Sequence, residues 1–309
     1  MIGCKTNTLN TSLISDILRQ QCINELRETL HTQSKWLKVH AAEYLLWSGN
    51  AEGVQKVFQE EQQRFGTEAP YRIGIWRVLA QATDNTDEKK IWAGKILKAF
   101  LDTNGTDRVH AAETLAKLGM SPLKEAPEVT SHALNSTDTS LSLYTRWSVS
   151  FSSEDSLKAA GAAFFNLLVS EGVDSSIKKL AAYVVRHFGG LTKDNWCLLT
   201  KKALLESTGS QAGISMLSTA FVTAPVNSVQ SSSFQKIRKG LLKYYDSPDK
   251  ADRIEMAAAL SEKGSKDDLP VLISLLNNEK PVGNGIDQVD VQASSAYAIL
   301  KIGKHKDNL

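Results

Sequence analysis

The chain has 309 residues, of which 42% are hydrophobic, and its 36 basic residues nearly balance its 34 acidic ones. The near-neutral balance excludes a global field that would draw the protein to nucleic acid or to an anionic membrane. No run of about 18 consecutive apolar residues occurs, so the sequence predicts no membrane-spanning helix.

The amino terminus, Met1-Ile2-Gly3-Cys4, is followed by a polar run from Lys5 to Ser12. This arrangement resembles the end of a bacterial lipoprotein signal and its tether, without the hydrophobic part of such a signal. Two hypotheses follow. As the chain is written, a cytoplasmic location is expected, with Cys4 an ordinary terminal residue. If a signal peptide precedes Met1, Cys4 would carry a lipid anchor and the protein would be a cell-envelope lipoprotein.

Apolar residues recur every three or four positions along most of the chain, which is the period of an amphipathic helix. The clearest stripes lie within residues 14–30, 54–58, 91–100, 157–168, 198–205 and 237–242. No segment shows sustained strand alternation with hairpin turn signals. The sequence therefore predicts an all-α fold.

A short motif recurs along the chain: small residues, then an aliphatic residue, then glycine four positions later. Its five copies read VHAAEYLLWSG, VHAAETLAKLG, KLAAYVVRHFG, IEMAAALSEKG and ASSAYAILKIG, and they end at Gly49, Gly119, Gly189, Gly264 and Gly303. Paired small residues let a neighbouring helix approach closely, and a glycine in the left-handed conformation ends a helix. Spacings of 70, 70, 75 and 39 residues between copies predict two, two, two and one repeats of about 35–40 residues.

A degenerate copy, YRIGIWRVLAQ, lies midway between the first two, with Gly74 and Ile75 in place of the His-Ala pair. The last unit is the most legible: LPVLISLL precedes VDVQASSAYAILKIG within residues 267–303. This unit resembles a HEAT repeat, and weaker matches extend the resemblance back to about Trp36. The resemblance implies a HEAT/armadillo-like α-α superhelix, a solenoid of stacked helix pairs whose concave face commonly holds another macromolecule.

The predicted organisation has four parts. Residues 1–34 form an amino-terminal tail and a first helix that belongs to the solenoid, and residues 35–120 form HEAT-like repeats. Residues 121–153, rich in Ser and Thr, fit the pattern poorly and are interpreted as an irregular connection with one helix near Leu141 to Val149. Residues 154–309 return to HEAT-like repeats.

Two copies of the motif contain His-x-x-Glu, as His40 with Glu43 and His110 with Glu113. Residues three apart share a helical face, so each pair offers two potential metal ligands. A catalytic metal usually takes three protein ligands, and two repeats would separate the pairs by roughly 20 Å at helix spacings of 8–10 Å. Deoxyhypusine hydroxylase, a HEAT-like diiron enzyme, carries adjacent His-Glu dipeptides in several copies, and this chain departs from that pattern. Hydrogen bonding across neighbouring repeats is the favoured interpretation.

Aromatic residues gather in the first third of the chain: Trp36, Trp47, Tyr71, Trp76 and Trp92. On a concave surface, such side chains could grip a peptide, although large aromatic groups also seal gaps between helix pairs. HEAT-like DNA glycosylases use a basic concave face, but here only the helix around Lys236 to Tyr245 mixes basic and aromatic residues. Nucleic acid is therefore not the expected partner.

These patterns predict a non-catalytic scaffold that binds another protein or peptide, with no metal or cofactor. The candidate partner-binding residues are the five aromatic residues above together with His40, Glu43, His110 and Glu113. The alternative is an enzyme on a HEAT-like scaffold, either hydroxylase-like or glycosylase-like. No glycine-rich phosphate loop, Gly-x-Ser-x-Gly elbow or His-Glu-x-x-His motif occurs in the sequence.

Overall fold

A computed structural model describes residues 13–206 and 212–304, and over these ranges the fold is all-α. Cys4 and the proposed lipoprotein feature lie outside the described residues. The described α-helices are α1 Asp16–Thr32, α2 Lys35–Trp47, α3 Val54–Phe65, α4 Tyr71–Ala82, α5 Thr86–Leu101, α6 Arg108–Lys117, α7 Pro127–Leu134, α8 Thr139–Ser150, α9 Glu154–Val169, α10 Ser175–Val185, α11 Lys193–Glu206, α12 Gly213–Val222, α13 Ser232–Leu242, α14 Lys250–Lys263, α15 Leu269–Leu276 and α16 Gly285–Ile302. Three short 3₁₀ turns, η1 Val226–Ser228, η2 Lys243–Asp246 and η3 Lys266–Asp268, complete the described elements.

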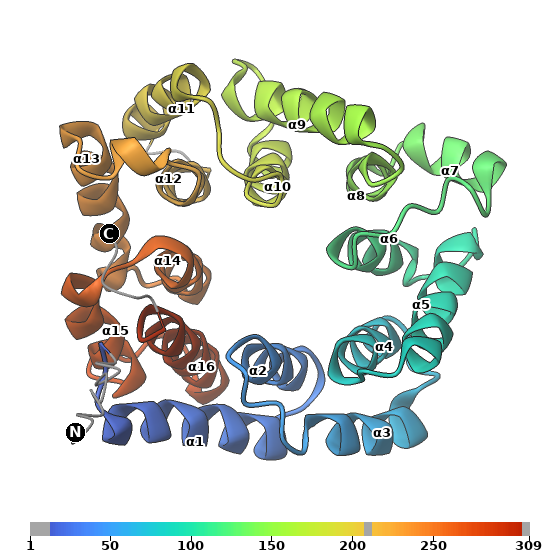
Figure 1. Cartoon of the computed structure of the whole chain (residues 1–309), viewed down its shortest axis with the longest axis horizontal. Helices are drawn as coiled ribbons and strands as arrows, with labels where there is room; N and C mark the ends of the chain where they lie inside the picture. The colour runs from blue at the N-terminus through green and yellow to red at the C-terminus, as the bar shows by residue number, and fades with distance from the viewer. Residues whose placement is uncertain (1–12, 207–211, 305–309) are drawn as a thin grey trace, which may run out of the picture.

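The helices alternate between two layers, as the predicted stacking of helix pairs requires. Odd-numbered helices form an outer layer and even-numbered helices an inner layer, whose members are seen nearly end-on in Figure 1. Each inner helix packs against the inner helices before and after it in the chain. The resulting shape in Figure 1 is a ring of helix pairs.

The ring closes where the two ends of the chain meet. Helix α16 packs against both α1 and α2. At this junction the Gln21 side-chain amide donates to Asn277 (2.9 Å), and the rings of Tyr44 and Tyr297 stack with centroids 4.7 Å apart. The predicted concave face of the solenoid is therefore the inner wall of a closed ring.

The inner helices run parallel to one another, because their corresponding ends meet. Lys304, just after α16, donates to the Ser48 carbonyl at the end of α2 (2.5 Å). Lys263, at the end of α14, donates to the Val222 carbonyl at the end of α12 (2.9 Å) and also to the Ala224 carbonyl. A cation at these positions satisfies terminal carbonyls and compensates the negative end of the helix dipole.

All copies of the sequence motif lie in inner helices, namely α2, α4, α6, α10, α14 and α16. One inner helix stands between each two copies that are 70 or 75 residues apart: α4, which holds the degenerate copy, then α8 and α12. The copies in α14 and α16, 39 residues apart, follow each other directly. The predicted numbers of repeats are therefore confirmed.

The glycines that end the motif do not all share one conformation. Gly49, Gly119 and Gly189 have φ of 73°, 68° and 90°, which is the predicted left-handed conformation. The prediction is wrong for Gly264 and Gly303, whose φ values are −68° and −61°. Packing explains glycine there: an added Cβ would lie 2.9 Å from Ile302 Cδ1 at Gly264 and 2.6 Å from Ile14 Cδ1 at Gly303.

The stretch 121–153 differs from the expected irregular connection. The helix expected near residues 141–149 is present as α8, but α7 precedes it, and the two form a further pair in the ring. Asp138 caps α8 by accepting from the Leu141 N–H (3.1 Å). Ser and Thr are weak helix formers that favour caps and turns, so the composition of this stretch did not indicate a helix pair. The buried residues of the pair include Leu143 and Trp147.

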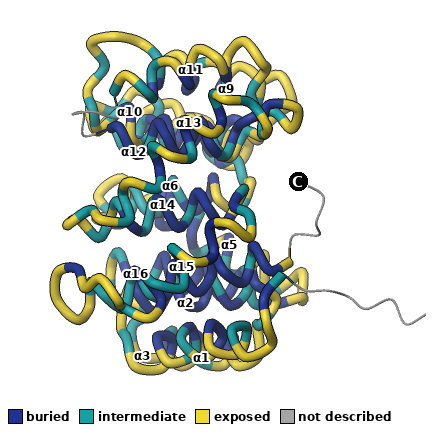
Figure 2. The backbone as a smooth tube through the Cα atoms, turned by 90° about the vertical axis from the view of Figure 1, so that its left-hand side faces the viewer, coloured by how far each residue is buried: buried dark blue, intermediate teal, exposed yellow. Residues whose placement is uncertain are grey.

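The core lies between the two layers. Phe58, Phe100 and Phe164, from outer helices α3, α5 and α9, are fully buried, and so are the paired alanines of the inner helices. Figure 2 shows buried positions within the helix bodies and exposed positions at the turns and the outer surface. None of the described helices combines the length and apolar character needed to cross a membrane.

Candidate functional site: the inner wall of the ring

One stripe of residues follows each inner helix at positions 13, 9, 6 and 2 before the motif glycine, or before Thr83 in α4. Steps of four, three and four residues place such positions on one helical face. We call these residues the inner stripe; its members used below are Trp36, His40, Glu43 and Trp47 of α2, Gly74, Arg77 and Gln81 of α4, His110, Glu113 and Lys117 of α6, Tyr183 and His187 of α10, Glu255 and Glu262 of α14, and Asp290, Ser294, Tyr297 and Lys301 of α16. The stripe faces the ring centre, because some of its side chains reach past an intervening inner helix. Trp36 of α2 contacts His110 of α6, and Lys117 of α6 contacts Tyr183 of α10.

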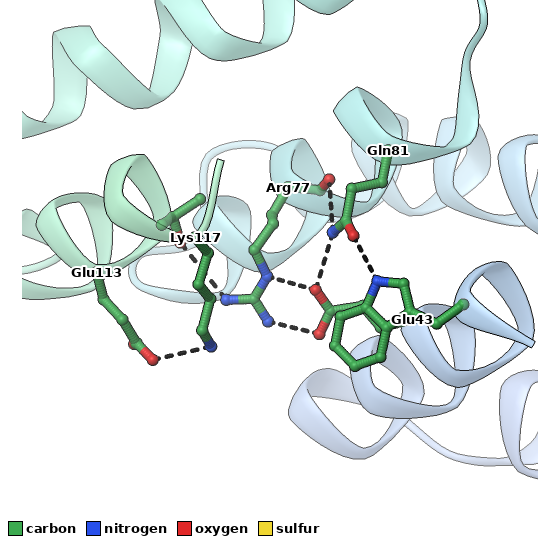
Figure 3. Close-up of polar contacts among 7 residues, drawn as sticks. Glu43, Arg77, Gln81, Glu113 and Lys117 are labelled. Carbon is green, nitrogen blue, oxygen red and sulfur yellow. Dashed lines mark hydrogen bonds and ion pairs between the residues drawn. The ribbon is translucent and has the colours of Figure 1, made fainter. Parts of the chain in front are cut away.

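Glu43 and Arg77 form the most enclosed ion pair of the stripe (Figure 3). Arg77 Nε donates to Glu43 Oε1 (2.7 Å) and Arg77 Nη2 to Glu43 Oε2 (2.9 Å), while Gln81 adds a third bond to Oε1 (2.9 Å). Burial alone would raise the pKa of Glu43, but the charge of Arg77 outweighs it and the pKa lies below its ordinary value. Glu43 is therefore an ionised, fully bonded carboxylate.

Glu113 pairs within its own helix with Lys117, whose Nζ lies 2.8 Å from Glu113 Oε1 (Figure 3). The Lys117 ammonium also lies over the ring of Tyr183, 5.6 Å from its centroid, and so links α6 to α10. Burial opposes ionisation of Glu113, yet the cations Lys117 and Arg77 bring its pKa below the ordinary value. Both predicted glutamates are thus held as carboxylates by basic neighbours.

The two predicted histidines have different surroundings. His40 Nδ1 lies 3.7 Å from Asp290 Oδ1 on α16, close enough for an ion pair when the imidazole is protonated. The ring of His110 packs against Trp36, with centroids 5.2 Å apart. Trp36 reaches across α4 because Gly74 has no side chain: a Cβ there would lie 3.0 Å from the indole. Among the described residues, Glu43 is the one of these four that makes the expected hydrogen bonds to a neighbouring repeat.

Three aromatic side chains gather where the ring closes. Trp47 lies 6.1 Å from Tyr44 and 5.9 Å from Tyr297, measured between ring centroids. Trp47 Nε1 donates to Gln81 (2.8 Å), and the Tyr44 hydroxyl is hydrogen-bonded to Ser294 (3.2 Å). Tyr297 is buried, whereas 48% of Trp47 is exposed. We call Tyr44, Trp47 and Tyr297 the seam aromatic group.

A second aromatic group lies on α8 and α10, across the ring from the first (Figure 1). His187 packs at a centroid distance of 4.8 Å from both Trp147 and Tyr183. Its Nδ1 is hydrogen-bonded to the Tyr183 carbonyl (2.9 Å), so the neutral ring carries its proton there and its Nε2 is an acceptor. These neighbours desolvate part of the imidazole and lower the pKa of His187 to about 4, which keeps it neutral at pH 7, while the rest of the side chain is exposed.

The remaining predicted aromatic residues lie away from the inner stripe. Tyr71 is buried between α4 and α3, where its hydroxyl donates to Glu61 (2.6 Å). Trp76 is also buried there, and its Nε1 donates to Gln62 (2.6 Å). Trp92 lies on outer helix α5, with the Lys95 ammonium 4.5 Å from its ring centroid. These three side chains pack between layers or on the outer side.

Sequence reasoning missed several stripe residues, including Arg77, Gln81, Lys117, Tyr183, His187 and Tyr297. Their signal is the variation within the motif: the small and aliphatic positions mostly repeat, while the positions 6 and 2 before the glycine carry Glu, Arg, Tyr, Trp, Gln, Lys and His, and Ala once. Repeated packing positions beside variable ones indicate the face that each helix turns to the ring centre.

Two further findings concern metal binding and similarity to known proteins. Among residues 13–206 and 212–304, no group of three or more His, Cys, Asp or Glu side chains is arranged to hold a metal ion. Comparison of the chain with protein-family models, with curated proteins and with solved structures found no significant match. The geometry of the ring is therefore the basis for the functional proposal.

Proposed function

We propose that this protein is a non-catalytic scaffold that binds another protein or peptide at the inner wall of the ring. The observation that carries the proposal is the exposure of Trp47 within the seam aromatic group. A large aromatic side chain that is held by neighbours yet half exposed has the character of an interface hot spot. The proposed contact surface comprises the stripe positions nearest the carboxyl ends of the inner helices: Trp47, Gln81, Lys117, His187, Glu262 and Lys301.

The surroundings of Trp47 support an interface rather than a loose surface residue. The indole is oriented by Gln81 and flanked by two tyrosines, so little side-chain freedom is left to lose on binding. His187 and Glu262, at corresponding positions of α10 and α14, are also exposed and offer polar contacts. A closed ring presents this surface in one fixed arrangement.

The resemblance to HEAT repeats supports the same proposal by analogy, because such solenoids mostly act as scaffolds. The competing enzyme hypothesis has less support. Both oxygens of Glu43 are already bonded, and its pKa is lowered, which makes it a poor general base. One oxygen of Glu113 is paired with Lys117, and its pKa is also lowered. The carboxylate of Glu43 therefore joins α2 to α4, and that of Glu113 pairs with a cation of its own helix.

An affinity capture experiment tests the proposal. Wild-type protein, W47A and I91A would each be used as bait in lysate from the source organism, separated into soluble and envelope fractions. Ile91 is 57% exposed on outer helix α5 and provides a matched apolar control. We expect a saturable partner that is retained by I91A and lost from W47A. A partner held equally by both variants would place the interface elsewhere, and binding of no protein in either fraction would refute the proposal.

A further inference from the structure

A pocket of about 270 Å³ lies away from the inner stripe, between α12, α13, the carboxyl end of α14 and η3. Leu13, at the start of the described chain, completes its wall. An engineered cavity of about 150 Å³ can hold benzene, so this pocket has room for a six-membered ring with a short substituent. Its residues take no part in the proposed protein interface.

One side of the pocket is apolar. Phe221 and Phe234 stack with centroids 4.9 Å apart and planes 21° apart, and both are almost fully buried. Val229 and Leu13, each half-buried, add aliphatic surface beside them. This lining fits the apolar body of a small molecule, because ligand pockets are mostly apolar with a few polar groups that set orientation.

The other side carries charge, part of which is already paired. Arg238 donates to Asp268 Oδ1 through Nε (2.9 Å) and Nη2 (2.6 Å). Asp268 Oδ2 in turn accepts from the Ser265 N–H (2.9 Å). This buried carboxylate therefore has its partners within the protein and does not offer a site for a cationic ligand.

Lys263 differs because its partners are neutral. Its ammonium donates to the Val222 and Ala224 carbonyls, and within the described part of the chain it forms no ion pair with an acid. An ammonium has three protons, so two bonds leave one for a ligand. Burial lowers the pKa of Lys263, an effect that an anion bound nearby would oppose.

We propose that this pocket binds a monoanionic carboxylate with a ring-sized apolar body, the carboxylate accepting from Lys263 and the body resting against Val229 and Phe234. The charge balance selects the class: three basic side chains, Arg238, Lys263 and Lys266, face two acidic ones, Asp267 and Asp268. A monoanion neutralises a single excess positive charge, whereas a dianionic phosphate would leave one negative charge without a partner in the pocket. Either a free acid or the terminal carboxylate of a peptide ending in an aromatic residue has this chemistry.

Titration of the full chain by NMR tests the proposal with three probes: 3-phenylpropanoate, 3-phenylpropanamide, and a tetrapeptide ending in phenylalanine with a free carboxylate. We expect the acid or the peptide to shift resonances of the pocket residues saturably, and the uncharged amide to bind about tenfold more weakly, as the loss of a charge-assisted hydrogen bond predicts. Stronger binding of the peptide than of the free acid would identify a chain terminus as the natural source. Saturation by neither carboxylate at millimolar concentration would refute the proposal.

Two variants locate the site. K263M keeps the aliphatic stem and removes the ammonium, so affinity should fall about tenfold or more. K236M, at an exposed position of α13 outside the pocket lining, is the matched control. Because K263M also removes a donor from two carbonyls, its thermal melt must be compared with that of wild type. V229W fills the pocket without altering Lys263 and should abolish binding even if K263M unfolds. Unchanged affinity in a folded K263M or in V229W would overturn the assignment. W47A should bind the probes normally, so failure of the protein-binding proposal would leave this one intact.

Discussion

Helices α4 and α12 occupy equivalent places in the ring. Each lies between two inner helices whose side chains contact each other past it, but the charged residues are placed differently in the two cases. In α4 the charge lies on the middle helix: Arg77 is buried and binds Glu43 of α2 with two hydrogen bonds. Helix α12 is mostly apolar, and the charges lie on its two neighbours, where Arg186, the residue after α10, pairs with Glu255 of α14 at 2.9 Å.

The comparison shows that the same arrangement of helix pairs accepts either a buried charge or apolar side chains on the middle helix. A buried charge requires a complete set of partners, and α4 supplies them through Glu43 and Gln81. In α12 the Thr219 hydroxyl donates to the Ala182 carbonyl of α10 (2.9 Å). The other buried residues of α12 are mostly apolar and pack against the neighbouring helices. We therefore expect mutations around α4 to be more damaging than equivalent ones around α12.

The largest expected effect is that of R77M. The substitution leaves the buried carboxylate of Glu43 with Gln81 as its remaining side-chain partner, so the free energy of unfolding should fall by about 3–5 kcal/mol. Urea denaturation measures this loss. The double variant E43L/R77M removes both charges and should recover much of the stability. Equal losses in the single and double variants would show that packing, not charge, dominates at α4.

A smaller effect is expected for G74A. The new Cβ would lie 2.9 Å from Val39 Cγ2 and 3.0 Å from Trp36, which overpacks the contact between α2 and α4. Overpacking costs about 1–3 kcal/mol, and the higher helix propensity of alanine offsets at most about 1 kcal/mol of it. The control is G94A on outer helix α5, where no atom lies within 4 Å of the added Cβ, and this variant should gain about 0.5–1 kcal/mol. A stabilised G74A would contradict the close approach of Trp36.

At the α12 position, R186M should lower stability by about 1–2 kcal/mol, between the values typical of exposed and buried ion pairs. The side chains of Arg186 and Glu255 are 12% and 22% exposed, so water can partly replace the lost partner. Chemical denaturation beside R77M gives the comparison directly. A loss as large as that of R77M would remove the distinction between the two positions.

The smallest effect near neutral pH should come from protonation of the two stripe glutamates. Glu43 and Glu113 have lowered pKa values in the folded protein, so their contribution to stability is complete above the ordinary value of 4.5 and is lost as pH falls through the folded value. We expect little change between pH 7 and 5 from these groups and a progressive loss below about 4.5. Denaturation curves at pH 7, 5 and 3.5 test this, and E43L/R77M should show the weaker acid dependence. Equal acid sensitivity in wild type and the double variant would show that the α4 pair does not contribute to it.

The motif predicted where on the helices much of the candidate site lies, but it did not identify all of the residues that belong to the site. Trp47, His40, Glu43, His110 and Glu113 all lie on the inner stripe, as the shared helical face suggested. Tyr71 and Trp76 belong to the same stretch of sequence but lie between layers, because aromatic content alone does not specify which face of a helix a side chain occupies. Tyr297 could not be linked to Trp47, since 250 residues separate them and only ring closure joins them.

The sequence by itself determined the helical period, the repeat of about 35–40 residues and the alternation of helices that packs paired alanines against neighbours. These are local properties, set by side-chain size and spacing along a few turns of helix. Closure was decided by the tertiary structure alone, because the rotation from one helix pair to the next depends on how many side chains pack together. The accumulated rotation brings α16 against α1 and α2, and thereby assembles both the seam aromatic group and the stripe of side chains around the ring centre.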